Sequence, residues 1–175
     1  MSTEPPENDN GDETERRRFA SPPCALADVD PAYSGLMPID ELLALLNTLL
    51  EGERAGARGI TETCLPLAAP ADEEALREIA ADEGRFCSML YRHIVRLGGT
   101  PSNATGAFAD KLALSETLIE RLQLLNRGQA WVVRQLAPAL PQINDPDLRA
   151  DLTEMLRVHE NNIARCDALL AARSG

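Results

Sequence analysis

Four polar side chains that can bind metal ions each stand in the middle of a stripe of apolar residues: Glu53, Glu83, Gln129 and His159. A polar side chain on a core-facing stripe costs free energy unless it is paired, hydrogen-bonded or bound to a ligand. Carboxylates together with an imidazole suit iron, manganese or zinc better than copper(I). The four residues therefore predict a buried polar layer that could hold one such ion.

The spacing of these residues favours a helix around each of them. His159, for example, follows Met155 by four positions and precedes Ile163 by four, which places all three on one helix face. Each of the four also lies about ten to thirteen positions, or roughly 15–20 Å, from the expected start of its helix. In a bundle with one long crossover they could reach a common level.

Glycine stands directly beside three of the four residues, at Gly52, Gly84 and Gly128. Glycine inside a helix costs about 1 kcal/mol relative to alanine, so it usually has a packing reason. Room for a ligand around the polar layer is one interpretation, and close packing of the helices is the other. The sequence favours the two about equally.

The apolar periodicity predicts four helices and no strands. The first helix is expected over about 39–58, followed by a loop over 59–71 that contains glycine and two prolines. Asp72 is expected to cap the second helix, and Gly98-Gly99 to stop it.

The connection that follows the second helix is longer than a usual helix–helix turn. It spans roughly 16 residues with a short helix near 108–114, which suits a crossover that runs the length of a bundle. Ser115 is expected to cap the third helix and Pro138 to end it. Asp145 and Pro146 predict the start of the fourth helix.

Composition predicts a single domain behind a tail. Residues 1–36 are expected to form a disordered, acidic, proline-rich tail, and residues 37–173 the bundle. The net charge of -11 argues against a nucleic-acid partner, and no segment is long and apolar enough to span a membrane. The four cysteines form no CxxC pair, and no hydrophobic segment follows the arginines at 16–18. Reduced thiols and a cytoplasmic location are therefore expected.

A few residues outside the layer have candidate roles. Trp131 is expected on the back of the third helix, which suggests a homodimer contact, although packing of the crossover over it is simpler. His93 is expected at a surface or an interface. Asn126 and Asn162 are further candidates for the layer.

The chain from about residue 38 to 172 resembles the ferritin-like superfamily. Three segments also resemble an uncharacterised bacterial family of ferritin-like domains: LNTLLEGERAGA at 46–57, Asp82-Glu83, and LLNRGQ at 124–129. The resemblance implies an all-α, up-down-down-up four-helix bundle with a long crossover between helices 2 and 3. It supports the fold more than it supports any activity.

The di-iron pattern of that superfamily is only half present. It needs a glutamate on the first and third helices and Glu-x-x-His on the second and fourth. Phe86 stands in place of the histidine of the second helix, Gln129 in place of the third-helix glutamate, and Leu156 in place of the fourth-helix glutamate. Three of six ligands match, which argues against a di-iron centre and against ferroxidase or oxygen-activating chemistry.

The leading hypothesis is a bundle that binds a single iron, manganese or zinc ion through Glu53, Glu83 and His159. Gln129 would be a further ligand or a hydrogen-bond donor to one. An oxidoreductase or an iron-handling protein would be the corresponding role. The alternative is a metal-free structural or interaction module whose polar layer fixes helix register. A third hypothesis is a small-molecule pocket between the helices, lined by the glycines.

Overall fold

The computed structural model describes residues 35–173, so the predicted tail lies outside the described residues up to position 34. Four long helices make up the bundle: α1 (Ile39–Gly59), α2 (Pro70–Arg96), α4 (Leu118–Ala139) and α5 (Pro146–Ala171). The short helix α3 (Phe108–Ala113) lies in the crossover. The described range contains no β-strand, and none of its helices combines the length and apolarity needed to cross a membrane.

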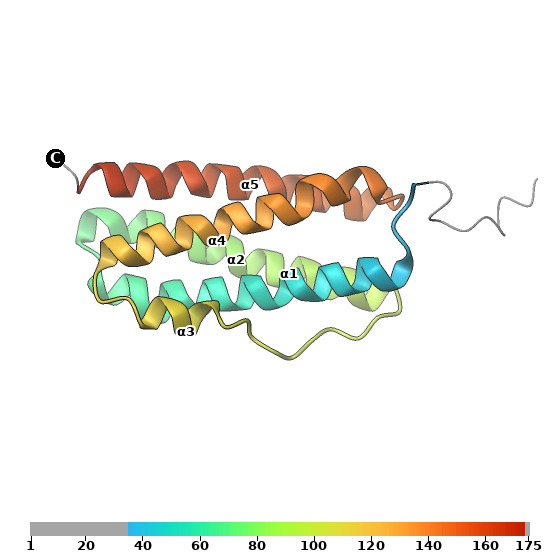
Figure 1. The fold of residues 1–175 in the computed structure, drawn as a ribbon, viewed down its shortest axis with the longest axis horizontal. Helices are drawn as coiled ribbons and strands as arrows, with labels where there is room; N and C mark the ends of the chain where they lie inside the picture. The colour runs from blue at the N-terminus through green and yellow to red at the C-terminus, as the bar shows by residue number, and fades with distance from the viewer. Residues whose placement is uncertain (1–34, 174–175) are drawn as a thin grey trace, which may run out of the picture.

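The path of the chain confirms the predicted up-down-down-up topology. In Figure 1, α1 and α5 run in one direction and α2 and α4 in the other. The crossover after α2 returns along the whole bundle before α4 begins, and it carries α3 against α1. The predicted all-α four-helix bundle, with a long crossover between its second and third long helices, is confirmed.

The apolar core is divided into two clusters of buried side chains. The first cluster, which includes Leu46 and Leu90, surrounds the start of α1. The second, which includes Ile79 and Leu125, surrounds the opposite end of the bundle. Along each long helix and its extension, the polar residue predicted for the layer falls between members of the two clusters. The up-down-down-up arrangement therefore brings the four polar residues to one level.

The predicted loop over 59–71 is wrong, because the chain stays largely helical there. A π-helical turn, η3 (Ile60–Cys64), continues α1, and a 3₁₀ turn, η4 (Leu65–Leu67), follows it. Ile60 and Cys64 are fully buried in the second cluster. The burial of these side chains outweighs the local preference of Gly59 and the prolines for a loop.

Two predicted helix starts were placed at the wrong residue. Helix α2 begins at Pro70, because proline suits the first helical position, and Asp72 lies in the first turn instead of capping it. Helix α4 is capped by Thr117, not Ser115: the Thr117 hydroxyl accepts from the Glu120 amide, and the Glu120 carboxylate accepts from the Thr117 amide. The Asp145 cap is confirmed, since its side chain accepts from the Leu148 amide at 2.9 Å.

The predicted stop at Pro138 is wrong as well. Helix α4 includes this proline in its last turn, runs to Ala139, and passes into the 3₁₀ turn η5 (Leu140–Gln142). A proline this close to the end removes only one helical hydrogen bond. Ala139 and Ile143, which follow it, are buried. Packing at the end of the helix therefore extends it past the proline.

Replacing Thr117 with alanine should lower the free energy of unfolding by about 1 kcal/mol, because the capping box loses its hydroxyl. The matched control is Ser115→Ala, which removes a hydroxyl outside the capping box and should change stability by a few tenths of a kcal/mol at most. Urea denaturation followed by circular dichroism measures both. Equal losses in the two variants would contradict the cap assignment.

Candidate metal centre

The four predicted layer residues meet in the interior of the bundle. Glu53 comes from α1, Glu83 from α2, Gln129 from α4 and His159 from α5, and none is more than 3% exposed. One side-chain ligand atom from each of Glu53, Glu83 and His159 lies within 4.8 Å of the others. The bundle thus brings two carboxyl groups and one imidazole together in its interior, where very little of each side chain is exposed.

A hydrogen bond of His159 shows that its ring nitrogen Nδ1 carries a proton. Nδ1 lies 2.9 Å from the carbonyl oxygen of Met155, one turn earlier on α5. A carbonyl oxygen can only accept, so Nδ1 is the protonated nitrogen. In the neutral ring, Nε2 therefore presents a lone pair, and it does so 3.2 Å from Oε1 of Glu53.

This contact needs a positive charge or a proton between its two atoms. A lone pair on Nε2 that faces an ionised carboxylate oxygen is repulsive. Within the described residues, both Glu53 oxygens, His159 Nε2 and Gln129 Oε1 lack a hydrogen-bond partner. Buried polar atoms are almost always satisfied in native proteins. The arrangement is therefore completed by a proton, carried by Glu53 or by His159 Nε2, or by a metal cation.

Burial changes the acidity of both carboxyl groups. It raises the pKa of Glu53 from its ordinary value of 4.5 to about 8. It also raises the pKa of Glu83 well above the ordinary value, and the nearby charge of Glu53 adds to this shift. The metal-free layer therefore holds protons near neutral pH, and a divalent ion that binds there has to displace them.

Gln129 orients the Glu83 carboxyl group, and Gly56 leaves the space that this group occupies. Gln129 Nε2 donates to Glu83 Oε1 at 2.5 Å. A side chain at Gly56 would put its Cβ 2.5 Å from Glu83 Oε2 and 2.8 Å from its carboxyl carbon, so the carboxyl group occupies space that only glycine leaves free. The sequence alone could not reveal this role of Gly56, because the contact joins two different helices.

Two of the three positions that lack a di-iron ligand, Phe86 and Leu156, are apolar, and Gln129 occupies the third. The ring of Phe86 lies 5.5 Å from that of His159, between centroids, at an angle of 36°. Leu156 packs against the first apolar cluster. Among residues 35–173, Glu53, Glu83 and His159 are the group of His, Cys, Asp and Glu side chains placed to share an ion. The layer thus offers ligands for one ion.

Two asparagines proposed for the layer bond elsewhere. Asn162 is buried, but its side chain bonds to Asp82 and Arg165 at the side of the bundle. Asn126 donates to Asp167 at 2.6 Å. The bond between Asn162 and Asp82 links α5 to α2, and the bond between Asn126 and Asp167 links α4 to α5. These asparagines therefore contribute to helix packing and are not part of the polar layer.

His93 is not a surface residue. It is 7% exposed and lies between α2 and α5, where its Nε2 is 2.8 Å from Asp151 Oδ2. Arg96 donates to its Nδ1 at 2.9 Å. His93 therefore lies at an interface between two helices of the same chain, and not at the surface of the protein.

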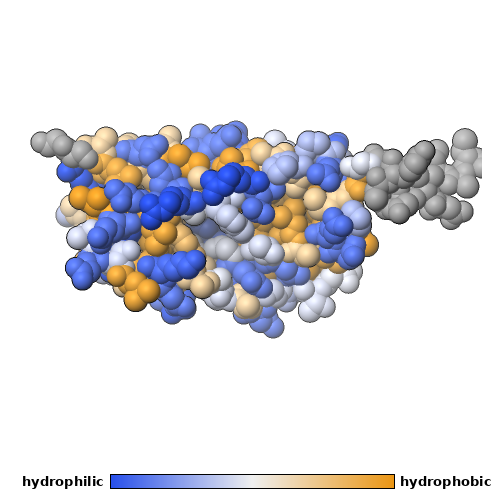
Figure 2. Space-filling view, in the orientation of Figure 1, coloured by the Kyte–Doolittle hydropathy of each residue, from blue (hydrophilic) through white to orange (hydrophobic). Residues whose placement is uncertain are grey.

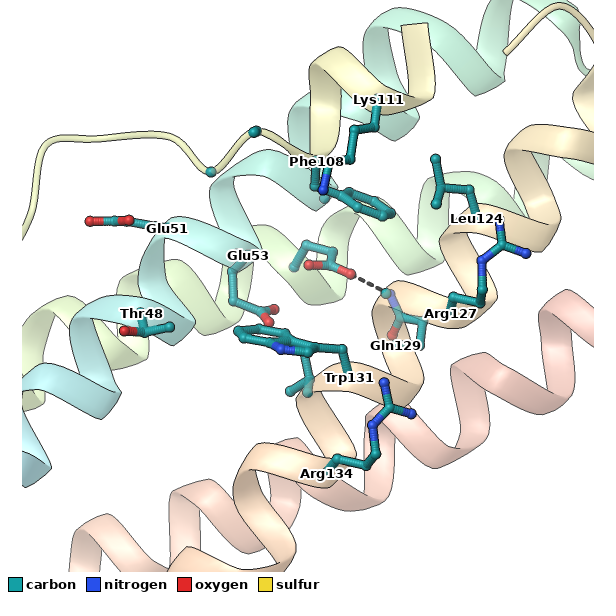
Figure 3. A pocket seen from close by; sticks show the side chains of 17 residues that line it. Thr48, Glu51, Glu53, Phe108, Lys111, Leu124, Arg127, Gln129, Trp131 and Arg134 are labelled. Carbon is teal, nitrogen blue, oxygen red and sulfur yellow. Dashed lines mark hydrogen bonds between the residues drawn. The ribbon is translucent and has the colours of Figure 1, made fainter. Parts of the chain in front are cut away.

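A cavity of about 490 Å³ connects the layer to the protein surface between α1, α3 and α4. Glu53, Glu83 and Gln129 lie at its inner end, and Figure 3 shows the hydrogen bond of Gln129 there. Trp131 lines the cavity and packs over Gly52, where an added Cβ would lie 3.2 Å from its ring. This packing against α1 explains Trp131 without a homodimer, which remains a prediction.

The glycines beside the layer divide into two kinds. Gly52 and Gly128 each accommodate an aromatic ring: an added Cβ at Gly128 would lie 2.9 Å from the ring of Phe108. Gly84 faces outward with nothing within 4 Å of an added Cβ. Close packing of rings therefore accounts for two of the three glycines, and these rings in turn form walls of the cavity.

Gly56→Ala should destabilise the protein by roughly 1–3 kcal/mol, because its methyl group would collide with the Glu83 carboxyl group. Gly84→Ala is the matched control, since it adds the same methyl group on an open helix face and should stabilise by about 0.5–1 kcal/mol. Thermal and urea denaturation compare the two. A Gly56→Ala protein as stable as Gly84→Ala would contradict the contact with Glu83.

Metal-free protein should lose stability as the pH rises from about 4.5 to about 8. In this window the unfolded Glu53 carboxyl group is ionised while the folded one keeps its proton, so the folded state binds more protons and rising pH favours unfolding. Glu53→Gln should flatten the slope in part, and Glu160→Gln, which changes an exposed carboxyl group on α5, should leave it. Urea midpoints at several pH values with a chelator present test this. Stability that stays constant or increases would argue against a neutral buried Glu53.

Comparison with known proteins agrees with the fold. Residues 40–168 match the model of a family described as "Domain of unknown function (DUF6306)". No curated protein matches the chain. A solved structure described as "ferritin like, diiron-carboxylate proteins from Bacillus anthracis str. Ames" is similar with a TM-score of 0.68 and 20% identity, covering 75% of this chain and 96% of that one. The similarity shows that the two proteins share a fold. Because the family model spans most of the chain, the protein belongs to the DUF6306 family.

Proposed function

We propose that the polar layer binds a single divalent iron, manganese or zinc ion through Glu53, Glu83 and His159. The contact between His159 Nε2 and Glu53 Oε1 carries this proposal. The two atoms lie 3.2 Å apart, both face the same space, and neither has a hydrogen-bond partner among the described residues. Nitrogen and oxygen atoms whose lone pairs face one space without a hydrogen-bond donor are arranged as the ligand atoms of a metal site are.

The surroundings of the three ligands support the proposal. Metal-binding histidines usually donate their second ring nitrogen to a carbonyl or carboxylate, as His159 does to Met155. Metal-binding carboxylates are usually held by a hydrogen bond, as Glu83 is by Gln129. The similar solved structure is described as diiron-carboxylate, which makes this level of the bundle a reasonable place for a metal, although the ligands of this chain suffice for one ion.

The residues of the layer would divide the work of binding. Glu53 and Glu83 would release their protons and neutralise the ion's charge, and His159 would complete the set as a neutral ligand. Gln129 would keep the Glu83 carboxyl group in one orientation. A bound ion would supply Lewis acidity or, for iron and manganese, electron transfer, which fits an oxidoreductase or an iron-handling protein. Three protein ligands leave positions open toward the cavity.

The metal-free module remains the competing hypothesis, and one observation favours it. The raised pKa of Glu53 allows its protonated form to donate to His159 Nε2 across the same 3.2 Å. The layer would then be a neutral hydrogen-bonded network that fixes the register of the helices. Metal content separates the two hypotheses.

Tag-free protein purified without chelator, or treated anaerobically with iron(II), should contain about one ion per chain by mass spectrometry. His159→Ala and Glu53→Ala should each lose it, because each removes one of three ligands. Glu160→Ala is the control: it changes an exposed carboxyl group next to His159 on the same helix and should keep the ion. Folded parent protein with no metal in either preparation would support the structural module instead.

A further inference from the structure

The cavity beside the layer has the size and walls of a small-molecule site. Its volume of about 490 Å³ falls in the range of ligand pockets, which are mostly apolar with a few polar groups. Phe108 and Trp131 form its main aromatic surfaces, and Leu124 and Val132 add aliphatic surface. In Figure 3 the rings of Phe108 and Trp131 flank the hydrogen bond between Gln129 and Glu83. These walls suit a flat, apolar body.

Three basic residues lie around the opening of the cavity: Lys111 on α3, and Arg127 and Arg134 on α4. Within residues 35–173, none of their charged groups has a hydrogen bond or an ion pair, whereas Arg96, for example, pairs with Asp145 at 2.7 Å. In a chain with a net charge of -11, three unpaired cations around one opening create a local positive field that attracts anions. Figure 2 shows this face hollowed, with strongly hydrophilic residues around the hollow.

One acidic residue, Glu51 on α1, also lines the cavity, and its carboxylate accepts a hydrogen bond from the Ser102 hydroxyl of the crossover. Its single negative charge offsets only part of the charge of the three cations, so they still leave an excess of positive charge around the opening. The two arginines project from α4, on the other side of the opening, and are free to bind a carboxylate in a bidentate manner (Figure 3).

The inner end of the cavity presents hydrogen-bond acceptors, so it requires a donor from the ligand instead of a negative charge. Gln129 Oε1 is buried and lacks a hydrogen-bond partner among the described residues, and so do both Glu53 oxygens. All three atoms are acceptors when Glu53 is ionised, and Gln129 Oε1 is an acceptor in every state. A ligand that reaches this end should therefore carry a hydroxyl or amino group there.

We propose that the cavity binds a small aromatic carboxylate with a hydroxyl or amino group at the end opposite the carboxylate. Arg127 and Arg134, with Lys111, hold the carboxylate at the opening. Phe108 and Trp131 enclose the ring, and Gln129 Oε1 accepts from the hydroxyl or amino group. The proposal goes beyond the metal site, because the cations, the rings and Gln129 do not depend on an ion. If an ion is bound in the layer, a ligand in the same pose would reach the open coordination positions of that ion.

The test uses the full-length chain, treated with chelator, and 4-hydroxybenzoate as the probe. Trp131 is the single tryptophan of the chain and lines the cavity, so its fluorescence reports binding directly, and calorimetry gives the stoichiometry. We expect a saturable change with one ligand per chain. The neutral 4-hydroxybenzyl alcohol should bind about tenfold more weakly or worse, because it loses the charge-assisted hydrogen bonds. Benzoate should also bind more weakly, because it leaves Gln129 unsatisfied.

The variant that tests the opening is Arg127→Gln with Arg134→Gln. Both residues are exposed, so the fold should survive, and affinity for 4-hydroxybenzoate should fall about tenfold or more while affinity for the alcohol stays the same. Arg92→Gln is the control, since Arg92 is an exposed arginine on α2 outside the cavity. It should bind like the parent.

Several results would overturn the proposal. These are no saturable binding, equal affinity for the acid and the alcohol, unchanged binding in the double variant, or equally tight binding of inorganic phosphate, which would indicate a nonspecific anion site. Because the protein is metal-free in this experiment, the outcome is independent of the metal analysis. Repeating the titration with iron(II) shows whether the two sites are coupled: tighter binding of the probe in loaded protein would support the pose that points the hydroxyl group toward the ion.

Discussion

The unfavourable burial of two carboxyl groups beside an imidazole constrains the rest of the bundle. Removing these carboxyl groups from water raises their pKa values, and Nε2 of His159 lies 3.2 Å from Oε1 of Glu53. Each neighbour is adapted to this cost: Met155 fixes the tautomer of His159, Gln129 holds Glu83, and a glycine leaves room for the Glu83 carboxyl group. Apolar side chains at these positions would pack as well without such support. The layer is therefore an arrangement that the fold maintains against a local free-energy cost.

Much of the layer could be predicted because it depends on local periodicity. The spacing of Glu53 or His159 from apolar neighbours one turn away fixes its face, and the helix order fixes its level. What depends on contacts between distant segments could not be predicted. The space that Gly56 leaves for Glu83, and the position of Phe108 on the crossover, arise only once the helices pack. The helical path through η3 was missed for the same reason, since burial of Ile60 decides it.

The similar solved structure is described as diiron-carboxylate and shares the fold of this chain, and a shared fold does not imply a shared site. Here two of the three positions that depart from the di-iron pattern hold the apolar residues Phe86 and Leu156. Phe86 packs on the ring of His159 and belongs to the first apolar cluster. The apolar core thus extends into the space where further ligands would stand.

The position of the layer between two apolar clusters also bears on how the protein unfolds. Leu46 and Leu90 belong to one cluster and Ile79 and Leu125 to the other, and the helices are continuous through both. Side-chain packing is interrupted only where the polar residues meet. The two ends of the bundle are therefore coupled through the helix backbones and through the proton or ion that links Glu53, Glu83 and His159. Protons or an ion at this level would set how cooperatively the two ends open, so that a change of occupancy is felt in amide exchange far from the site.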